Sequence, residues 1–322
     1  MSLDISCAFA TSIDTPEHVV LAEQLGYKRA WLYDSPALYP DVWVALAECA
    51  RRTSVIELGP GVLVPSLRHP MTNAAAIAHL ATLAPGRLNV AIGSGFTGRL
   101  TLGQRPLKWS FVREYVACLQ ALLAGETTQW EGSAVRMMHP AGFGAARPIK
   151  VPFIIGTSGP KGEAVARELG DGVFSTSPTT GHDRCIILAF GTVRQPDEAY
   201  DAPRVIDAAG HGAAVGLHAM VERGMDVTAL PGGADWLAEL NATPEGERHL
   251  PLHDLHLIGV NDRDRPMLTA AFMQRAGGVR TADEWRTHLA SLEAAGATEI
   301  AFQPAGPDIE SELRNFMQAA TG

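Results

Sequence analysis

Residues 89–100 read NVAIGSGFTGRL, an apolar run that ends in three glycines spaced G-x-G-x-x-G, namely Gly93, Gly95 and Gly98. In a doubly wound sheet this spacing forms the phosphate loop of a dinucleotide site, provided that it follows the first strand and opens a helix. Here the run is predicted to be a fourth strand, and the irregular stretch RLTLGQRPLKW follows, so no helix is expected to begin at Gly95. We interpret the glycines as the end of a barrel strand, where backbone approaches a flat cofactor closely. A turn that binds no ligand is the alternative.

Strands and helices alternate on both sides of this stretch. Short apolar runs predict strands at 3–10, 29–33, 56–64, 87–92, 151–155, 172–175, 185–193 and 298–303. Helices are expected at 15–26, 41–52, 70–83, 111–124, 161–169, 198–224, 281–295 and 309–320, while 225–266 has no readable pattern. Near-continuous apolar strands that alternate with helices are typical of a parallel sheet. The pattern predicts one α/β domain, 1–322, folded as a (β/α)8 TIM barrel with insertions after strands 4 and 7; a doubly wound sheet is the main alternative.

Composition restricts the class of partner. The chain has 322 residues, 46% of them hydrophobic, a net charge of −9 and four scattered cysteines with no C-x-x-C pair. The acidic balance argues against nucleic acid and anionic membranes, and the cysteine pattern suits a reducing compartment. Since the N-terminus lacks a basic signal start and no apolar run reaches about 18 residues, we expect no membrane partner and a cytoplasmic location.

Small residues collect at the carboxyl ends of the predicted strands, where a barrel carries its functional groups. Gly59-Pro60-Gly61 interrupts the third strand and predicts a bulge, either purely structural or one that presents backbone to a planar ring. The acid of this rim is Asp34, which either caps the next helix or hydrogen-bonds a flavin-type ring. A rim so poor in acids and bases indicates that a cofactor supplies the chemistry.

An anion site is predicted at Gly156 to Gly162, GTSGPKG, which follows a strand and directly precedes a helix. Its amides and hydroxyls lie at the positive end of the helix dipole, which favours phosphate, and Lys161 adds positive charge. An ordinary helix cap by Thr157 or Ser158 is the alternative.

The histidines give no clear ligand set. His69 is interpreted as a loop-packing residue more readily than as a catalyst. His249, His253 and His256 approach a metal-binding spacing, but such groupings on helix faces arise often by chance, and we expect no metal.

Four stretches, 23–34, 56–96, 112–132 and 151–175, resemble the luciferase-like monooxygenases, the flavin- and deazaflavin-dependent oxidoreductases. The C-terminal half resembles them more loosely. The resemblance implies a (β/α)8 barrel that binds FMN or the deazaflavin coenzyme F420, with ring contact at the bulge through a non-prolyl cis peptide near Gly61-Val62. It also implies phosphate binding by the loops after strands 5 and 6, and a homodimer.

The rim and the resemblance together predict two sets of site residues. Those expected to bind the cofactor are Asp34, Gly61, Val62, Gly93, Ser94, Gly156, Thr157, Ser158, Gly159, Pro160, Ser175 and Thr176. Those expected to line the substrate pocket, from position alone, are Phe9, Tyr39, His69, Phe96, Arg99 and Trp109, with Arg99 or Arg105 available for one anionic group. Many relatives carry a histidine at the end of strand 2, where this chain has Asp34-Ser35-Pro36-Ala37, so the catalytic acid and base stay unassigned.

The leading functional interpretation is a monooxygenase that uses reduced FMN and dioxygen on a small organic substrate, supplied by a separate flavin reductase. The alternative is hydride transfer with coenzyme F420, because the missing histidine argues against luciferase-type chemistry. Two interpretations from other classes are a non-catalytic flavin-binding barrel and a metal-dependent barrel hydrolase.

Overall fold

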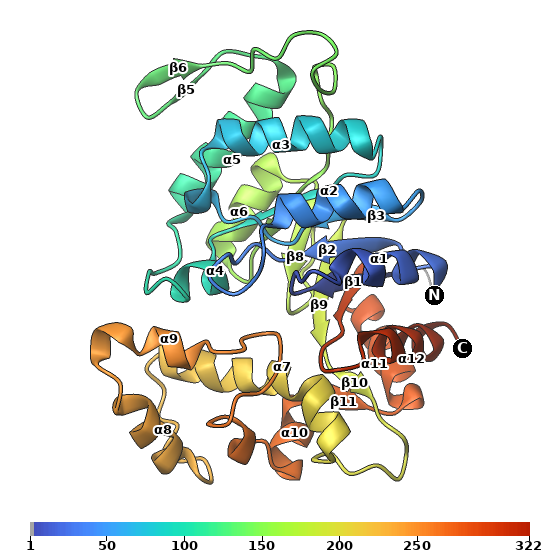
Figure 1. Ribbon diagram of the computed structural model, residues 1–322, viewed down its shortest axis with the longest axis vertical. Coiled ribbons are helices and arrows are strands. Elements are labelled where there is room, and N and C mark those ends of the chain that lie inside the picture. Colours follow the sequence, from blue (N-terminus) through green and yellow to red (C-terminus); the bar gives the residue numbers. More distant parts are fainter. Residues whose placement is uncertain (1–2) are drawn as a thin grey trace.

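Eight parallel strands form a nearly closed barrel in the computed structural model, which describes residues 3–322 (Figure 1). They are β1 (Asp4–Phe9), β2 (Arg29–Leu32), β3 (Glu57–Pro60), β4 (Val90–Gly93), β7 (Phe153–Gly156), β8 (Gly172–Ser175), β9 (Cys185–Phe190) and β12 (Glu299–Gln303). Their order is β3-β2-β1-β12-β9-β8-β7-β4, and two isolated bridges, Leu58 to Leu88 and Leu63 to Ile92, join β3 to β4. The first and last strands pair with each other, which confirms the barrel and excludes the open doubly wound sheet.

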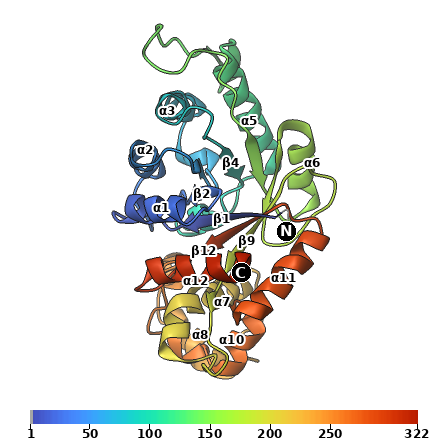
Figure 2. The same ribbon diagram turned by 90° about the vertical axis from the view of Figure 1, so that its right-hand side faces the viewer.

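Helices connect most successive strands on the outside of this barrel (Figure 2). They are α1 (Thr15–Gln24), α2 (Val42–Arg52), α3 (Pro70–Leu83), α5 (Trp109–Ala124), α6 (Pro160–Leu169), α11 (Ala282–Ala294) and α12 (Ile309–Thr321). Side-chain caps fix several starts: Asp41 accepts from two amides at the beginning of α2, and Thr281 and Glu284 form a capping box on α11. Within residues 3–322 we find no helix with the length and apolarity needed to cross a bilayer.

The two insertions differ from what the sequence predicts. After β4 the chain forms the short helix α4 (Phe96–Leu100), so the expectation that no helix begins at Gly95 is wrong. Gly95 adopts a left-handed conformation, with φ of 79°, which turns the chain directly from strand to helix. The segment 225–266, which gave no pattern, contains α8 (Gly233–Asn241) and α9 (His249–Leu252), both too short to produce a strong helical period.

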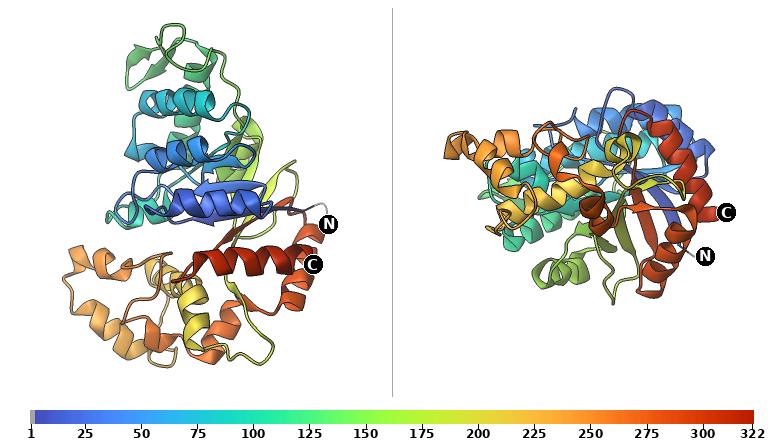
Figure 3. Two further views of the ribbon diagram at one scale, coloured as in Figure 1. Left: turned by 45° about the vertical axis from the view of Figure 1, so that its right-hand side comes forward. Right: turned by 90° about the horizontal axis from the view of Figure 1, so that it is seen from below.

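The second insertion, 191–280, forms a layer on one side of the barrel (Figures 1 and 3). Its main element is α7 (Pro203–Glu222), which is followed by α8, α9 and α10 (Ala270–Ala276). A small parallel pair, β10 (Thr192–Val193) with β11 (Val279–Arg280), joins its two ends. After α5 the chain adds the hairpin β5 (Thr128–Trp130) and β6 (Ser133–Val135), at the far end of the molecule from α7 (Figure 1). That the whole chain is one domain stays a prediction.

The amino ends of the barrel strands are closed by a buried charged network. Arg29 donates to Glu57 at 2.6 Å and also pairs with Glu299, whose side chain is 2% exposed. Glu299 accepts a further hydrogen bond from the Trp31 indole at 2.9 Å, and Asn89 donates to Glu57 at 2.8 Å. Each of these polar groups therefore has a partner, as burial requires.

Candidate functional site

A cavity of about 500 Å³ opens at the carboxyl ends of the strands. It is lined by most of the residues predicted for the cofactor: Asp34, Gly61, Val62, Gly93, Ser94, Gly156, Thr157, Ser158, Gly159, Ser175 and Thr176. Phe96 and Trp109, predicted for the substrate, line the same cavity. The structure therefore brings residues from five strand ends and from the 94–110 segment to one place.

The floor of the cavity is built around Val62. The peptide bond between Gly61 and Val62 is cis, as the resemblance implied. A Cβ atom added at Gly93 would lie 2.9 Å from the Val62 side chain, and one added at Gly156 would lie 2.8 Å from it. The absence of a side chain at these two glycines makes room for Val62. It also leaves the backbone at both positions open to close approach by a ligand.

The loop after β7 leads into the amino end of α6. Gly159 occupies the N-cap position, and no side chain caps this helix, so the alternative of an ordinary cap by Thr157 or Ser158 is wrong. The Ser158 and Ser175 hydroxyls lie 3.4 Å apart and face each other across the ends of β7 and β8. An uncapped helix end beside two hydroxyls, in a cavity wall, is suited to a phosphate group.

Asp34 caps no helix. Both of its carboxylate oxygens accept from Arg68 at 2.8 Å, and one also accepts from the Val64 amide at 3.2 Å. Burial raises the pKa of Asp34, although Arg68 and the Val64 amide act in the opposite direction. The carboxylate holds the loop after β3 against the end of β2, and it reaches the cavity lining from that position.

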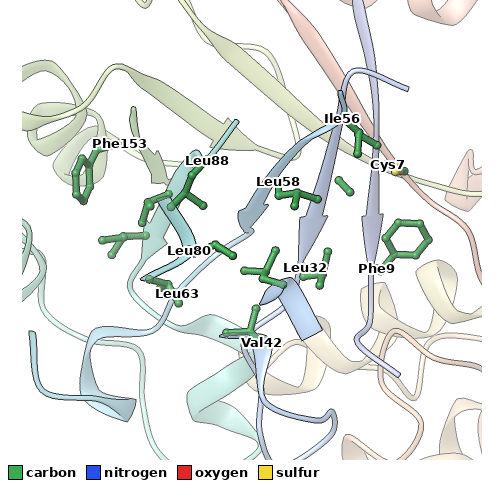
Figure 4. Close-up of a cluster of buried hydrophobic side chains, with 14 of the residues drawn as sticks. Cys7, Phe9, Leu32, Val42, Ile56, Leu58, Leu63, Leu80, Leu88 and Phe153 are labelled. Carbon is green, nitrogen blue, oxygen red and sulfur yellow. The ribbon is translucent and has the colours of Figure 1, made fainter. Parts of the chain in front are cut away.

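Five predicted site residues lie outside the cavity lining, and three of them are Phe9, His69 and Pro160. Phe9 is packed in the apolar core between the sheet and the helices (Figure 4). Side chains along a strand alternate between its two faces, and that of Phe9 points outward from the barrel. His69 caps α3 by accepting from the Met71 amide at 3.0 Å. Pro160 occupies the first turn of α6.

Arg99 also lies outside the lining, since its guanidinium is used to fix the loop that carries it. It donates to the Ser66 hydroxyl at 2.6 Å and to the Arg105 carbonyl at 2.6 Å. These two hydrogen bonds hold the first insertion against the loop after β3, which places Phe96 and Trp109 at the cavity.

Comparison with known proteins identifies the family of this chain. The sequence model of the luciferase-like monooxygenases matches residues 11–185, which is more than half of the chain. The chain belongs to this family. The matched segment contains β2 to β8 and thus the floor, the Asp34 contact and the α6 loop of the cavity.

Two relatives within the luciferase-like family carry names that specify a cofactor or a reaction. The F420-dependent glucose-6-phosphate dehydrogenase of Beutenbergia cavernae is 33% identical over 186 residues, 51% of this chain and 52% of that protein. The 5,10-methylenetetrahydromethanopterin reductase of Archaeoglobus fulgidus is 32% identical over 160 residues, 48% of this chain and 47% of that protein. The chain thus spans about half the length of the curated relatives it matches.

Solved structures agree on the fold. An F420-dependent secondary alcohol dehydrogenase in complex with an F420-acetone adduct superimposes with a TM-score of 0.69, covering 100% of both chains at 16% identity. At this identity the similarity supports the luciferase-like barrel and nothing finer.

The part of this luciferase-like site that sequence reasoning missed comes from the second insertion. Val215, Ala219 and Arg223 lie four residues apart on one face of α7, and all three line the cavity together with Leu257. The four-residue spacing is visible in the sequence and indicates a shared helix face. It gives no sign that this face covers the mouth of the barrel.

A buried hydrogen-bond network holds that part of the wall in place. Tyr39, predicted for the substrate, instead donates its hydroxyl to the His256 carbonyl at 2.6 Å. Gln303 at the end of β12 donates to the Leu257 carbonyl at 2.6 Å and accepts from the Tyr33 hydroxyl at 2.8 Å. Leu257 has a positive φ of 61°, which is uncommon for leucine, so the network fixes an otherwise unfavourable backbone.

The charge on the cavity wall is sparse. Among its lining residues, all of which lie within 3–322, only Asp34 and Arg223 carry a formal charge, and Asp34 is already paired. The wall has neither a carboxylate pair nor a histidine. Such a wall can bind, orient and exclude water, while the reactive group comes from elsewhere.

Proposed function

We propose that this luciferase-like protein is an F420-dependent oxidoreductase that transfers a hydride to or from a small organic substrate. The observation that carries the proposal is the cofactor named in the relatives, which are F420-dependent, together with the cavity: the segment matched by the family model, residues 11–185, supplies its floor and its phosphate-type loop. This favours the sequence-based alternative over the FMN-dependent monooxygenase that was placed first.

The residues fit such a cofactor. Val62, seated between Gly93 and Gly156, gives an apolar floor beneath a flat ring. The loop Gly156 to Gly159 and the Ser175 hydroxyl would hold a phosphate at the uncapped end of α6. When bound, the deazaflavin supplies two-electron hydride chemistry and reacts poorly with dioxygen.

The chain's own residues have the task of shielding and orientation. Phe96, Phe174, Leu188 and Phe190 form the apolar wall above the floor and exclude water from the space where substrate meets the ring. Arg223, at the carboxyl end of α7, is the group that would receive an anionic substituent of the substrate, a role the sequence suggested for Arg99 or Arg105. The homodimer and the separate flavin reductase stay predictions.

The test is a titration of the purified protein with F420, FMN and reduced FMN under argon, followed by ring fluorescence or absorbance. We expect tight binding of F420 and weak binding of FMN. Preference for FMN in either redox state would favour the monooxygenase, and the next measurement would be oxygen consumption with reduced FMN. Binding of F420 without turnover of any phosphorylated sugar or secondary alcohol tested would favour the non-catalytic barrel. Failure to bind any of the three would overturn the proposal.

A further inference from the structure

Three buried histidines meet in the second insertion, directly behind the cavity wall. His218 lies on α7, and His253 and His256 lie in the turn after α9; each of the three is 2% exposed. The Nδ1 atom of His256 lies 3.3 Å from Nδ1 of His218 and 3.2 Å from Nδ1 of His253. The sequence had suggested His249 as the third member; the fold brings His218 there instead.

Carboxylates fix the protons of two of these rings. Asp264 accepts from His218 Nε2 at 2.8 Å and from the Trp236 indole at 2.8 Å. Because an ionised carboxylate only accepts, His218 carries its proton on Nε2 and turns a lone pair on Nδ1 toward the centre of the group.

His253 is arranged in the same way. Its Nε2 atom lies 3.2 Å from a Glu222 carboxylate oxygen, which leaves a lone pair on its Nδ1. Neutral His256 has one proton, which can serve at most one of its two short contacts. At least one pair of nitrogens, 3.2 or 3.3 Å apart, is therefore left with lone pair facing lone pair, and a positive centre is needed to relieve this.

The spacing of the three nitrogens matches one kind of positive centre. Zinc binds histidine nitrogen at about 2.0–2.1 Å, so tetrahedral coordination separates neighbouring ligand nitrogens by about 3.3–3.4 Å. The two short contacts have nearly this length, and all three ligand atoms lie within 4.8 Å of one another. A carboxylate behind a ligating histidine is also the usual outer partner of such a site.

We propose that His218, His253 and His256 bind a single divalent transition metal ion, Zn²⁺ in preference, through their Nδ1 atoms. The ion joins α7 to the turn after α9, two parts of the insertion that the sequence separates by more than thirty residues. A fourth position is left for water.

The proposed site also bears on the cavity. His218 lies between Val215 and Ala219 on α7, and His256 directly precedes Leu257. Val215, Ala219 and Leu257 line the wall. His256 Nε2 in addition lies 3.3 Å from the hydroxyl of Thr97, another lining residue. The metal would thus hold three sections of the wall at fixed positions, independently of which flavin the cavity binds.

The first test is metal content. The tag-free protein, exchanged into metal-free buffer, is analysed by inductively coupled plasma mass spectrometry, and we expect one zinc per chain. His218→Gln and His253→Gln should reduce this at least tenfold. The matched control is His211→Gln, because His211 is likewise buried on α7 but its ring has no hydrogen-bond partner among the described residues. It should retain the zinc.

The second test needs no variant and stays informative if the substitutions prevent folding. Wild-type protein is depleted of metal with a chelator and titrated with Co²⁺, which should give the strong visible bands of a four-coordinate ion with a one-to-one endpoint. Zn²⁺ should abolish the bands and raise the melting temperature. Wild-type protein that carries no metal and gives no such bands overturns the proposal, as does a His218→Gln variant that binds as the wild type does.

Discussion

The two ends of the barrel use the same eight strands in opposite ways. At the amino ends, the buried Arg29 and Glu299 and the half-buried Glu57 satisfy one another. At the carboxyl ends, β4, β7 and β8 finish in glycine or serine, and the end of α6 beside them is uncapped. Polar groups that pair with each other at the amino ends contribute to folding, whereas hydroxyls and amides without such partners at the carboxyl ends are available to bind a ligand. Each variant below changes one end, and the measurement is of folding stability, cofactor affinity or both.

The largest effect is expected from Arg29→Met at the amino end. It takes the nearer cation from the buried Glu299 and leaves Arg184 at 3.8 Å, which should cost about 3–5 kcal/mol of unfolding free energy, measured by urea denaturation. The exposed pair Arg113–Glu168 provides the control, since Arg113→Met should change stability little. Cofactor affinity of the folded fraction should stay at the wild-type value; a parallel loss of affinity would show that the two ends are coupled.

The next effect is expected from Gly162→Ala at the carboxyl end. A Cβ atom there would lie 2.0 Å from the Thr157 hydroxyl and 2.5 Å from Trp109, so the phosphate-type loop has to shift. We expect cofactor affinity to fall about tenfold or more, equivalent to about 1.4 kcal/mol, as followed by fluorescence titration. The control is Gly159→Ala, whose Cβ would meet nothing within 4 Å, so the shape of the loop should be unchanged. It shows whether affinity is lost through a shift of the loop or through the loss of a glycine.

A smaller change at the same end is Ser175→Ala. Removing this hydroxyl should weaken cofactor binding by about 0.5–1.5 kcal/mol while leaving the urea midpoint unchanged. Ser177→Ala, two residues further along and outside the cavity lining, should affect neither quantity. Equal binding by the two variants would mean that the loop after β8 does not hold the phosphate.

The smallest effect is a difference in pH dependence. Burial acts to raise the pKa of Glu57, but its contacts with Arg29 and Asn89 outweigh this and lower it, so its stabilising effect is lost as pH falls through that pKa. Burial raises the pKa of Asp34, so its contribution is present at low pH and is lost as pH rises through the raised value. Urea midpoints measured from about pH 7 to pH 3 should therefore fall less steeply in Glu57→Gln and more steeply in Asp34→Asn than in the wild type.

Much of the barrel can be predicted from sequence because each strand is a short apolar run bounded by turn residues. The runs ending at Gly93, Gly156 and Ser175 place the rim correctly, and the cavity forms where those ends meet. The second insertion is different, because its helices are short and their packing partners lie far away in sequence. Nothing local connects His218 with His253, or Val215 with Leu257, so this wall emerges only from the tertiary structure.

The packing of Val62 against Gly93 and Gly156 also constrains how this barrel can evolve. A lineage that replaces either glycine by a larger residue meets an obstacle on a different strand, so position 62 has to shrink first. The order of substitutions is therefore restricted: a larger residue at position 93 or 156 is harmful alone and becomes acceptable only after position 62 has become smaller. The residues at positions 62, 93 and 156 therefore determine the depth of the pocket together and have to change together.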